Sequence, residues 1–159
     1  MSLRHLLTAG VPAPITESAL LLLRLVAAVV FSAHGWDALG ASGIGGVVDA
    51  QREAGIPLPE LAAPFTVYAE IIGGILIALG ILTRLVAIAF TAIMLGAWVF
   101  VHAPNGLFVE NGGFELVMVL ATISVTLVVT GPGRYSVDHF LAGGGRKTAG
   151  AAEPSPSLP

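Results

Sequence analysis

The chain contains no cysteine, and few of its residues carry a charge. Without cysteine it can form no disulfide, thiol relay or iron–sulfur ligation of its own, so sulfur chemistry would need a partner or a small molecule. Charged residues make up 11% of the 159 residues, whereas soluble domains contain roughly 25%. The net charge of −3 is mild, and the sequence has no basic face for nucleic acid. The composition therefore argues against a soluble domain and against a nucleic-acid-binding protein.

Long apolar runs fill most of the chain instead. Hydrophobic residues make up 55% of it, and the mean hydropathy is +0.90. Four segments are apolar on all sides of a helix, which suits lipid rather than water, and one crossing needs about 20 residues. The sequence therefore predicts an all-α fold, a membrane-embedded four-helix bundle with four transmembrane helices. We expect these helices at residues 17–34, 62–82, 84–102 and 114–130.

The predicted bundle forms one domain, residues 17–140. A cytoplasmic N-terminal tail, residues 1–16, precedes it, and residues 47–54 between the first two helices have enough helical character to lie flat on the membrane surface. The last segment, residues 141–159, is rich in glycine, alanine, proline and serine and has little to bury. Such composition is typical of disorder, so we expect a disordered cytoplasmic C-terminal tail.

The positive charges predict the orientation. With four crossings, both termini and the turn at Arg84 share one side, and lysine and arginine concentrate near the cytoplasmic ends of membrane helices. That side holds Arg4, Arg84, Arg134, Arg146 and Lys147, against Arg52 on the other. We therefore expect a multi-pass protein of the cell (inner) membrane, with both termini in the cytoplasm and the loop 37–61 outside.

Three ionisable residues, Arg24, Glu70 and Glu115, lie within or beside the apolar runs. A charge near the middle of a bilayer costs at least about 2–3 kcal/mol, so such residues usually face one another or a cavity. We predict an ion pair between Arg24 and Glu70 across the bundle. The alternative is that Arg24 extends to the cytoplasmic headgroups.

Polar and aromatic residues also gather at the predicted outer ends of the helices. His34, His102 and Glu115 could handle protons there, although histidines at helix ends are often merely solvated. The candidate polar core and proton relay is therefore Arg24, His34, Glu70, His102 and Glu115, and the candidate ligand-binding residues are Phe31, Trp98, His102 and Glu115. No catalytic residue is identified.

A haem between His34 and His102 is conceivable, because helical bundles can hold cofactors between facing histidines. Both histidines lie close to the predicted membrane surface, so we expect neither haem nor a metal, and no covalently bound cofactor. A quinone could place its ring near Trp98 and Phe31 and accept hydrogen bonds from His102 or a protonated Glu115, as few polar groups in an apolar site allow.

Several short motifs, in this order and spacing, resemble the DoxX family of small four-helix membrane proteins over about residues 18–140. They are Leu23–Arg24–Leu25, His34–Gly35–Trp36, Gly55–Ile56–Pro57, Glu70 with Gly73–Gly74, Gly80–Ile81–Leu82–Thr83–Arg84, Gly112–Gly113 with Glu115, and Gly131–Pro132–Gly133–Arg134–Tyr135–Ser136 leading to Asp138. The family takes its name from membrane subunits of a thiosulfate:quinone oxidoreductase, and similar proteins are linked with quinone or catechol detoxification and with mycobacterial oxidoreductase assemblies. The resemblance implies no agreed catalytic set.

Two functions remain open at this point. The first is a membrane subunit of an oxidoreductase system, linked to quinone, without an electron-carrying cofactor of its own and dependent on a redox partner. The second is a non-enzymatic membrane accessory that anchors other enzymes, or a small carrier of lipophilic molecules. A homo-oligomer is compatible with both, and a bound quinone or a copurifying oxidoreductase would favour the first.

Overall fold

The computed structural model describes residues 11–144 of the chain, and within these residues every regular element is a helix. The predicted all-α fold is therefore confirmed. In order, the elements are α2 (Ala13–Ala41), α3 (Gly43–Glu53), α4 (Pro59–Leu79), α5 (Thr83–Ala97), the π-helix η1 (Trp98–His102), the 3-10 helices η2 (Ala103–Asn105) and η3 (Val109–Asn111), α6 (Glu115–Thr130) and α7 (Val137–Gly144).

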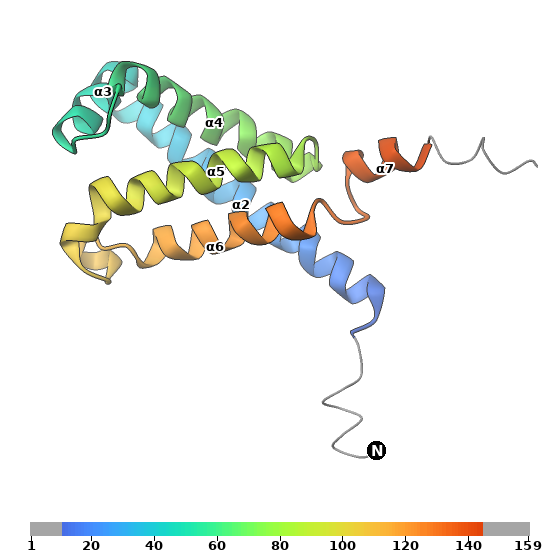
Figure 1. Ribbon diagram of the computed structural model, residues 1–159. Coiled ribbons are helices and arrows are strands. Elements are labelled where there is room, and N and C mark those ends of the chain that lie inside the picture. Colours follow the sequence, from blue (N-terminus) through green and yellow to red (C-terminus); the bar gives the residue numbers. More distant parts are fainter. Residues whose placement is uncertain (1–10, 145–159) are drawn as a thin grey trace, which may run out of the picture.

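Four of these helices build the predicted membrane bundle. The helix α2, the helix α4 and the stretch Thr83–Asn105 are each long and apolar enough to cross a membrane, and α6 is a shorter apolar helix of 16 residues. Figure 1 shows α4, α5 and α6 running alongside one another while α2 crosses them obliquely. The first turns of α2 and the helix α7 lie at one end of the bundle, which we name the inner end, and α3 lies at the opposite, outer end.

The first helix is longer than predicted at both ends. It begins at Ala13 and continues past residue 34 to Ala41. Pro14 is compatible with this start, because proline fits the first turn of a helix. Gly35, which looked like a helix exit, lies instead in the contact with α4: a β-carbon there would approach Ile71 Cγ1 to 2.7 Å. The glycine therefore serves close helix contact rather than a turn.

The predicted tails lie mostly outside the described residues. Residues 1–10 and 145–159 are not described, while α7 continues to Gly144, four residues past the predicted end of the bundle domain at 140. The predicted surface helix at 47–54 corresponds to α3, which spans Gly43–Glu53 and contacts α4.

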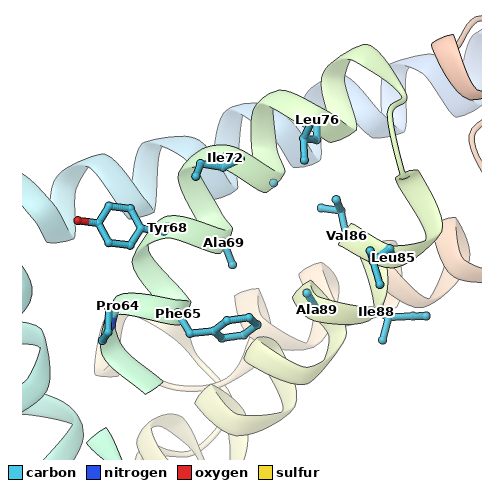
Figure 2. Close-up of a pocket in the computed structure, with 11 residues that line it drawn as sticks. Pro64, Phe65, Tyr68, Ala69, Ile72, Leu76, Leu85, Val86, Ile88 and Ala89 are labelled. Atoms are coloured by element: carbon cyan, nitrogen blue, oxygen red, sulfur yellow. The ribbon is translucent and has the colours of Figure 1, made fainter. Parts of the chain in front are cut away.

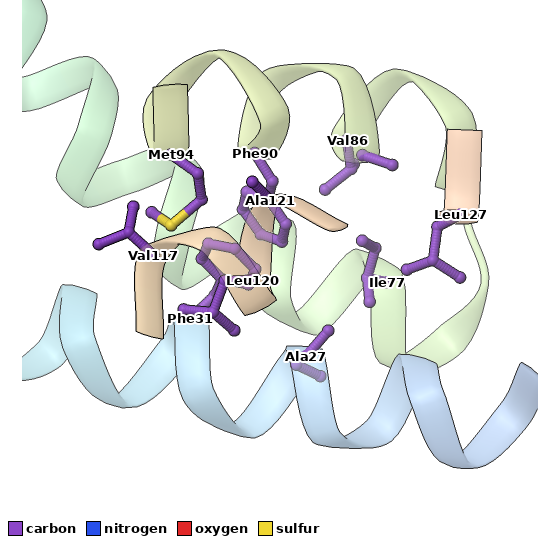
Figure 3. Close-up of a cluster of buried hydrophobic side chains, with 12 residues drawn as sticks. Ala27, Phe31, Ile77, Val86, Phe90, Met94, Val117, Leu120, Ala121 and Leu127 are labelled. Carbon is purple, nitrogen blue, oxygen red and sulfur yellow. The ribbon is translucent and has the colours of Figure 1, made fainter. Parts of the chain in front are cut away.

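The core lies where α2, α4, α5 and α6 meet. Figure 3 shows Phe31 of α2 among residues from the three other helices, and its ring stacks on Phe90 of α5 at a centroid distance of 3.7 Å. Large apolar side chains on the opposite faces stay exposed, among them Leu22, Ile72 and Val129. Apolar residues both inside and outside are what a bundle in lipid requires, since the surrounding solvent is itself hydrocarbon.

A glycine-based turn joins α4 to α5 at the inner end. The backbone N–H of Gly80 donates to Ile77 O at 3.1 Å, and that of Ile81 donates to Leu76 O at 2.9 Å. This is the Schellman pattern, which needs a left-handed residue just past the helix, and Gly80 supplies it with φ of 70°. The turn fixes where the last carbonyls of α4 point.

Candidate functional site

Arg24 is the most completely buried charged residue of the described chain, with 1% of its surface exposed. Its guanidinium donates four hydrogen bonds, all to backbone carbonyl oxygens. Nε donates to Ile77 O at 2.9 Å and Nη2 to Ala78 O at 2.8 Å, both in the last turn of α4. Nη1 donates at 2.8 Å to Pro132 O and to Tyr135 O, in the segment between α6 and α7. Arg24 therefore joins three parts of the chain at the inner end.

The predicted ion pair between Arg24 and Glu70 is wrong. Within residues 11–144 the ion pairs are those of Arg52 with Asp49 and with Glu60, and the donors of Arg24 go to carbonyls instead. The last turn of a helix leaves carbonyls without partners in the helix, and the helix dipole makes that end negative. The carbonyl of Ile77 lies close enough to accept a hydrogen bond from Arg24. Glu70 lies seven residues before Ile77 on α4, which is about 10 Å along the helix axis at 1.5 Å per residue. The alternative, extension to the headgroups, is not observed either.

Glu70 lies on the face of α4 that meets α2, and it is 8% exposed. A β-carbon at Gly35 of α2 would come within 3.0 Å of Glu70 Cβ, so the two helices touch at this residue. Among the described residues, no hydrogen bond or ion pair reaches its carboxyl group. Glu70 is thus a buried carboxyl in the membrane interior that stands apart from Arg24.

The glycine pair beside Glu70 brings α4 close to two other helices. A β-carbon at Gly74 would meet Ser32 Oγ and lie 3.0 Å from Ala28 O of α2. A β-carbon at Gly73 would lie 2.9 Å from Val86 Cγ1 and 3.0 Å from Phe90 Cε1 of α5. Adjacent residues of a helix point about 100° apart, so one pair serves two interfaces.

At the outer end, His102 and Glu115 hold the connection between η1 and α6. His102 Nδ1 lies 2.6 Å from Gly112 O, and the Glu115 carboxylate accepts a hydrogen bond of 2.7 Å from the backbone N–H of Val109. His34 is exposed on α2. The structure thus brings His102 and Glu115 to one connection. Among the described residues, no hydrogen bond or ion pair joins Arg24, Glu70 or His34 to them or to one another.

The two predicted aromatic ligand residues both pack inside the protein. Phe31 is 1% exposed and stacked on Phe90. Trp98 packs against the core and stacks on Phe114 at a centroid distance of 5.2 Å. Neither these residues nor His102 and Glu115 line the two cavities along α4 and α5 described below.

A large apolar groove runs between α4 and α5 on the lipid-facing side, with a cavity volume of about 660 Å³. Figure 2 shows its walls, in which Tyr68 is the residue with a polar side-chain atom. Its lining residues are Pro64, Phe65, Tyr68, Ala69, Ile72, Gly73 and Leu76 from α4, and Leu85, Val86, Ile88 and Ala89 from α5. We name it the α4–α5 groove. Their spacing by three or four places these residues on one face of each helix, a face that was not predicted as a site from the sequence.

Asp138 is a second polar residue that organises the inner end. Its carboxylate accepts hydrogen bonds from the backbone N–H groups of Leu82, at 2.9 Å, and Thr83, at 3.0 Å, and so caps the start of α5. Burial would raise the pKa of Asp138, but these N–H donors and the charge of Arg24 outweigh it and hold the pKa below its usual value. Within residues 11–144, no group of three His, Asp or Glu side chains is placed to hold a metal ion.

The apolar spans, the lipid-facing apolar surface and the buried polar contacts together define a small helical membrane protein. A family model described as DoxX matches residues 19–103. The chain belongs to the DoxX family.

Three relatives align with most of the chain. It is 32% identical over 127 residues to the Bacillus subtilis (strain 168) protein named "Putative oxidoreductase CatD", covering 79% of this chain and 88% of that protein. It is 31% identical over 125 residues to the inner membrane protein YphA of Escherichia coli (strain K12), covering 76% and 88%. It is 32% identical over 124 residues to the inner membrane protein YqjF of the same organism, covering 76% and 90%. No solved structure gives a significant match.

Proposed function

We propose that this protein is a membrane subunit of an oxidoreductase system, and that it holds a quinone-like molecule in the α4–α5 groove. The observation that carries the proposal is the groove itself, about 660 Å³ of space with walls that are almost wholly apolar. Ligand pockets for small molecules range over about 300–1,000 Å³. The name of the Bacillus subtilis relative, an oxidoreductase, supports the same class of function.

The position of the groove suits a molecule that reaches it through the membrane. Between lipid and protein there is little hydrophobic driving force, so close van der Waals contact decides what binds. The lining of the groove includes the small residues Ala69, Gly73 and Ala89, which leave room for an apolar part of a ligand to pack closely against the helices.

In this scheme a partner enzyme transfers the electrons, and this chain binds the quinone. Glu70 is the carboxyl that can hold a proton inside the bundle, one helix face away from the groove. His34, His102 and Glu115 are the candidates for proton exchange at the outer end. Arg24 takes a structural role in this scheme, since its donors are engaged by carbonyls.

We also propose that the protein lies in the inner membrane with its inner end in the cytoplasm. The start of α2 and the helix α7 lie at the same end in Figure 1, as four crossings require. Cysteines introduced singly at Ser42 and at Ala142 should react with a membrane-impermeant reagent from the outside and from the cytoplasmic side, respectively. Labelling of the Ser42 variant from the cytoplasmic side alone would reverse the orientation.

Quinone binding can be tested on the purified protein by equilibrium dialysis in detergent, with the uptake of empty micelles subtracted. We expect saturable binding of a short-chain quinone. The substitution Ala89→Trp fills the groove and should weaken that binding at least tenfold, about 1.4 kcal/mol. Val129→Trp places the same side chain on an exposed position of α6, outside the groove, and should leave binding unchanged.

Absence of saturable binding, or binding that Ala89→Trp leaves intact, would contradict this function. A protein that purifies without quinone, as a homo-oligomer or with a non-redox enzyme attached, would instead indicate the membrane accessory. Copurification of a soluble oxidoreductase in mild detergent would support the proposed partner.

A further inference from the structure

A second cavity, of about 280 Å³, lies at the outer end where α3, α4 and α5 meet. It differs from the α4–α5 groove in having a polar corner, formed by Gln51 of α3 and Thr66 of α4. The remaining lining is apolar and consists of Ile56, Ala62, Phe65, Ala92, Ile93, Gly96, Ala97 and Val101. We name this space the outer pocket.

The polar corner contains hydrogen-bonding groups with weak partners or none. Gln51 Nε2 donates to Thr66 Oγ1 over a long distance of 3.5 Å, and Gln51 Oε1 is buried without a partner in the described part of the chain. Buried side-chain oxygens are nearly always hydrogen-bonded, so an unpaired one calls for an explanation. The Thr66 hydroxyl, in contrast to that of Thr91 on α5, donates to no carbonyl of its own helix within residues 11–144. An acceptor and a donor without strong partners therefore belong to two neighbouring residues that line the same small space.

The outer pocket continues the α4–α5 groove, because Phe65 lines both. On α5 the lining residues of the two cavities form one stripe with spacings of three and four: Leu85, Ala89, Ala92 and Gly96. From Leu85 to Gly96 this stripe covers about 16 Å along the helix axis, at 1.5 Å per residue. At its outer end the helix becomes the π-helix η1, whose Val101 lines the pocket. One site thus has a long apolar part and a short part with two polar groups.

We propose that Gln51 and Thr66 bind the oxygen-bearing ring of a lipophilic molecule whose apolar chain lies in the α4–α5 groove. The identity of that ring as a quinone rests on the proposed function. A quinone carbonyl can accept a hydrogen bond from the Thr66 hydroxyl, and a quinol hydroxyl can donate one to Gln51 Oε1. The pair therefore accommodates both redox states of the ring. The assignment places the ring on α3 and α4, away from Trp98, His102 and Glu115, where the sequence had predicted it.

Equilibrium dialysis can locate the ring with two ligands of equal chain length, a short-chain quinone and an alkylbenzene without ring oxygens. Gln51→Leu and Thr66→Val each remove hydrogen-bonding capacity at nearly constant volume. We expect each to weaken quinone binding at least tenfold and to leave alkylbenzene binding unchanged. Unchanged alkylbenzene binding also shows that a variant is folded. Thr122→Val, at an exposed threonine of α6, is the matched control and should alter neither affinity.

The outcomes separate this inference from the proposed function. Quinone binding that is lost in Ala89→Trp but intact in Gln51→Leu and Thr66→Val would overturn the position of the ring and keep the function. A loss confined to His102→Ala or Glu115→Ala would move the ring to the connection before α6. Equal wild-type affinity for the alkylbenzene and the quinone would show that the cavity takes any apolar chain, which overturns the inference. A wild-type protein that binds neither overturns both proposals.

Discussion

The inner and outer parts of α4 differ in the partners of their polar groups, although Thr83 Oγ1 at the inner end is also buried without a partner among the described residues. At the inner end, the carbonyls of Ile77 and Ala78 accept hydrogen bonds from Arg24, and Asp138 accepts from the N–H groups that begin the next helix. Toward the outer end, the Glu70 carboxyl and the Gln51 amide oxygen have no partner among the described residues. Polar groups that are mutually satisfied stabilise a fold, and those left with spare capacity can meet a ligand or a proton. The inner end therefore supports the bundle, and the outer half is where we place function.

The difference follows from the direction of the chain. Both α4 and α6 run toward the inner end, so the negative ends of their dipoles meet there, and no water in the hydrocarbon can satisfy their carbonyls. Arg24 of α2 donates hydrogen bonds to carbonyl oxygens at both helix ends, to Ile77 O in α4 and to Pro132 O just past α6. A carboxyl group could not replace it, because a carboxylate has no proton to donate and a protonated carboxyl has one, whereas Arg24 donates four hydrogen bonds here.

Removing the arginine should have the largest effect. Arg24→Gln leaves at least two of the four carbonyls without a donor, and each buried carbonyl orphaned in this way costs about 1–3 kcal/mol. We expect the free energy of unfolding to fall by at least about 2 kcal/mol, measured by denaturant unfolding in detergent.

Arg24→Lys is the matched variant, since it keeps the charge but offers three donors from a single atom. It should recover part of the loss and remain below the wild type. A fully stable Arg24→Gln protein would mean that the inner end does not depend on these hydrogen bonds, and the comparison of the two ends would fail.

The next effect concerns the close contact of α2 with α4, which joins the two regions. In Gly74→Ala the new β-carbon would collide with Ser32 Oγ, and it would lie 3.0 Å from Ala28 O of the backbone, which cannot move aside easily. Overfilling of this kind destabilises by about 1–3 kcal/mol. Gly40→Ala in the same helix pair is the control, because nothing lies within 4 Å of its β-carbon. Equal thermal midpoints for the two variants would contradict the contact.

The sequence predicted the fold well and the partners of its polar residues poorly. Apolar runs determine how many helices form, so the four-helix membrane bundle was correct. The predicted end of the first helix, at residue 34, was wrong because a glycine such as Gly35 can mark either a turn or a close helix contact, and the sequence does not distinguish these. The partner of Arg24 was missed because a carbonyl acceptor exists at every residue and leaves no mark in the sequence. Only the path of the chain determines which carbonyls are free.

The candidate cavities were hidden for a similar reason. Small residues in a membrane helix can allow close helix approach, as Gly73 does toward α5. Small residues can also leave open space where the facing helix stays away, as Ala69, Ala89 and Gly96 do, and the sequence alone does not distinguish the two cases. Gln51 was not predicted, because it lies on α3, outside the four apolar segments.

The cap on α5 should have a moderate effect that depends on pH. Asp138→Ala removes the acceptor for two backbone N–H groups, and loss of such a cap costs about 0.5–2 kcal/mol. Since the folded-state pKa of Asp138 lies below its usual value, the stabilisation is complete above the unfolded pKa. It is lost as the pH falls through the lower folded pKa. Unfolding measured from pH 7 down to pH 3 should show wild type and variant converging in acid, whereas Asp37→Ala should follow the wild type throughout.

The smallest effect should come from Glu70→Gln. If Glu70 were paired with Arg24, neutralising it would strand a buried charge and cost about 3–5 kcal/mol. Because Arg24 is satisfied by carbonyls and Glu70 faces Gly35, we expect the isosteric amide to change the free energy of unfolding by less than about 1 kcal/mol. The double variant with Arg24→Gln should then be additive within about 0.5 kcal/mol, as for independent sites. A coupling energy well above that value would reinstate the ion pair, and with it a stabilising role for the one carboxyl that we leave free for protons.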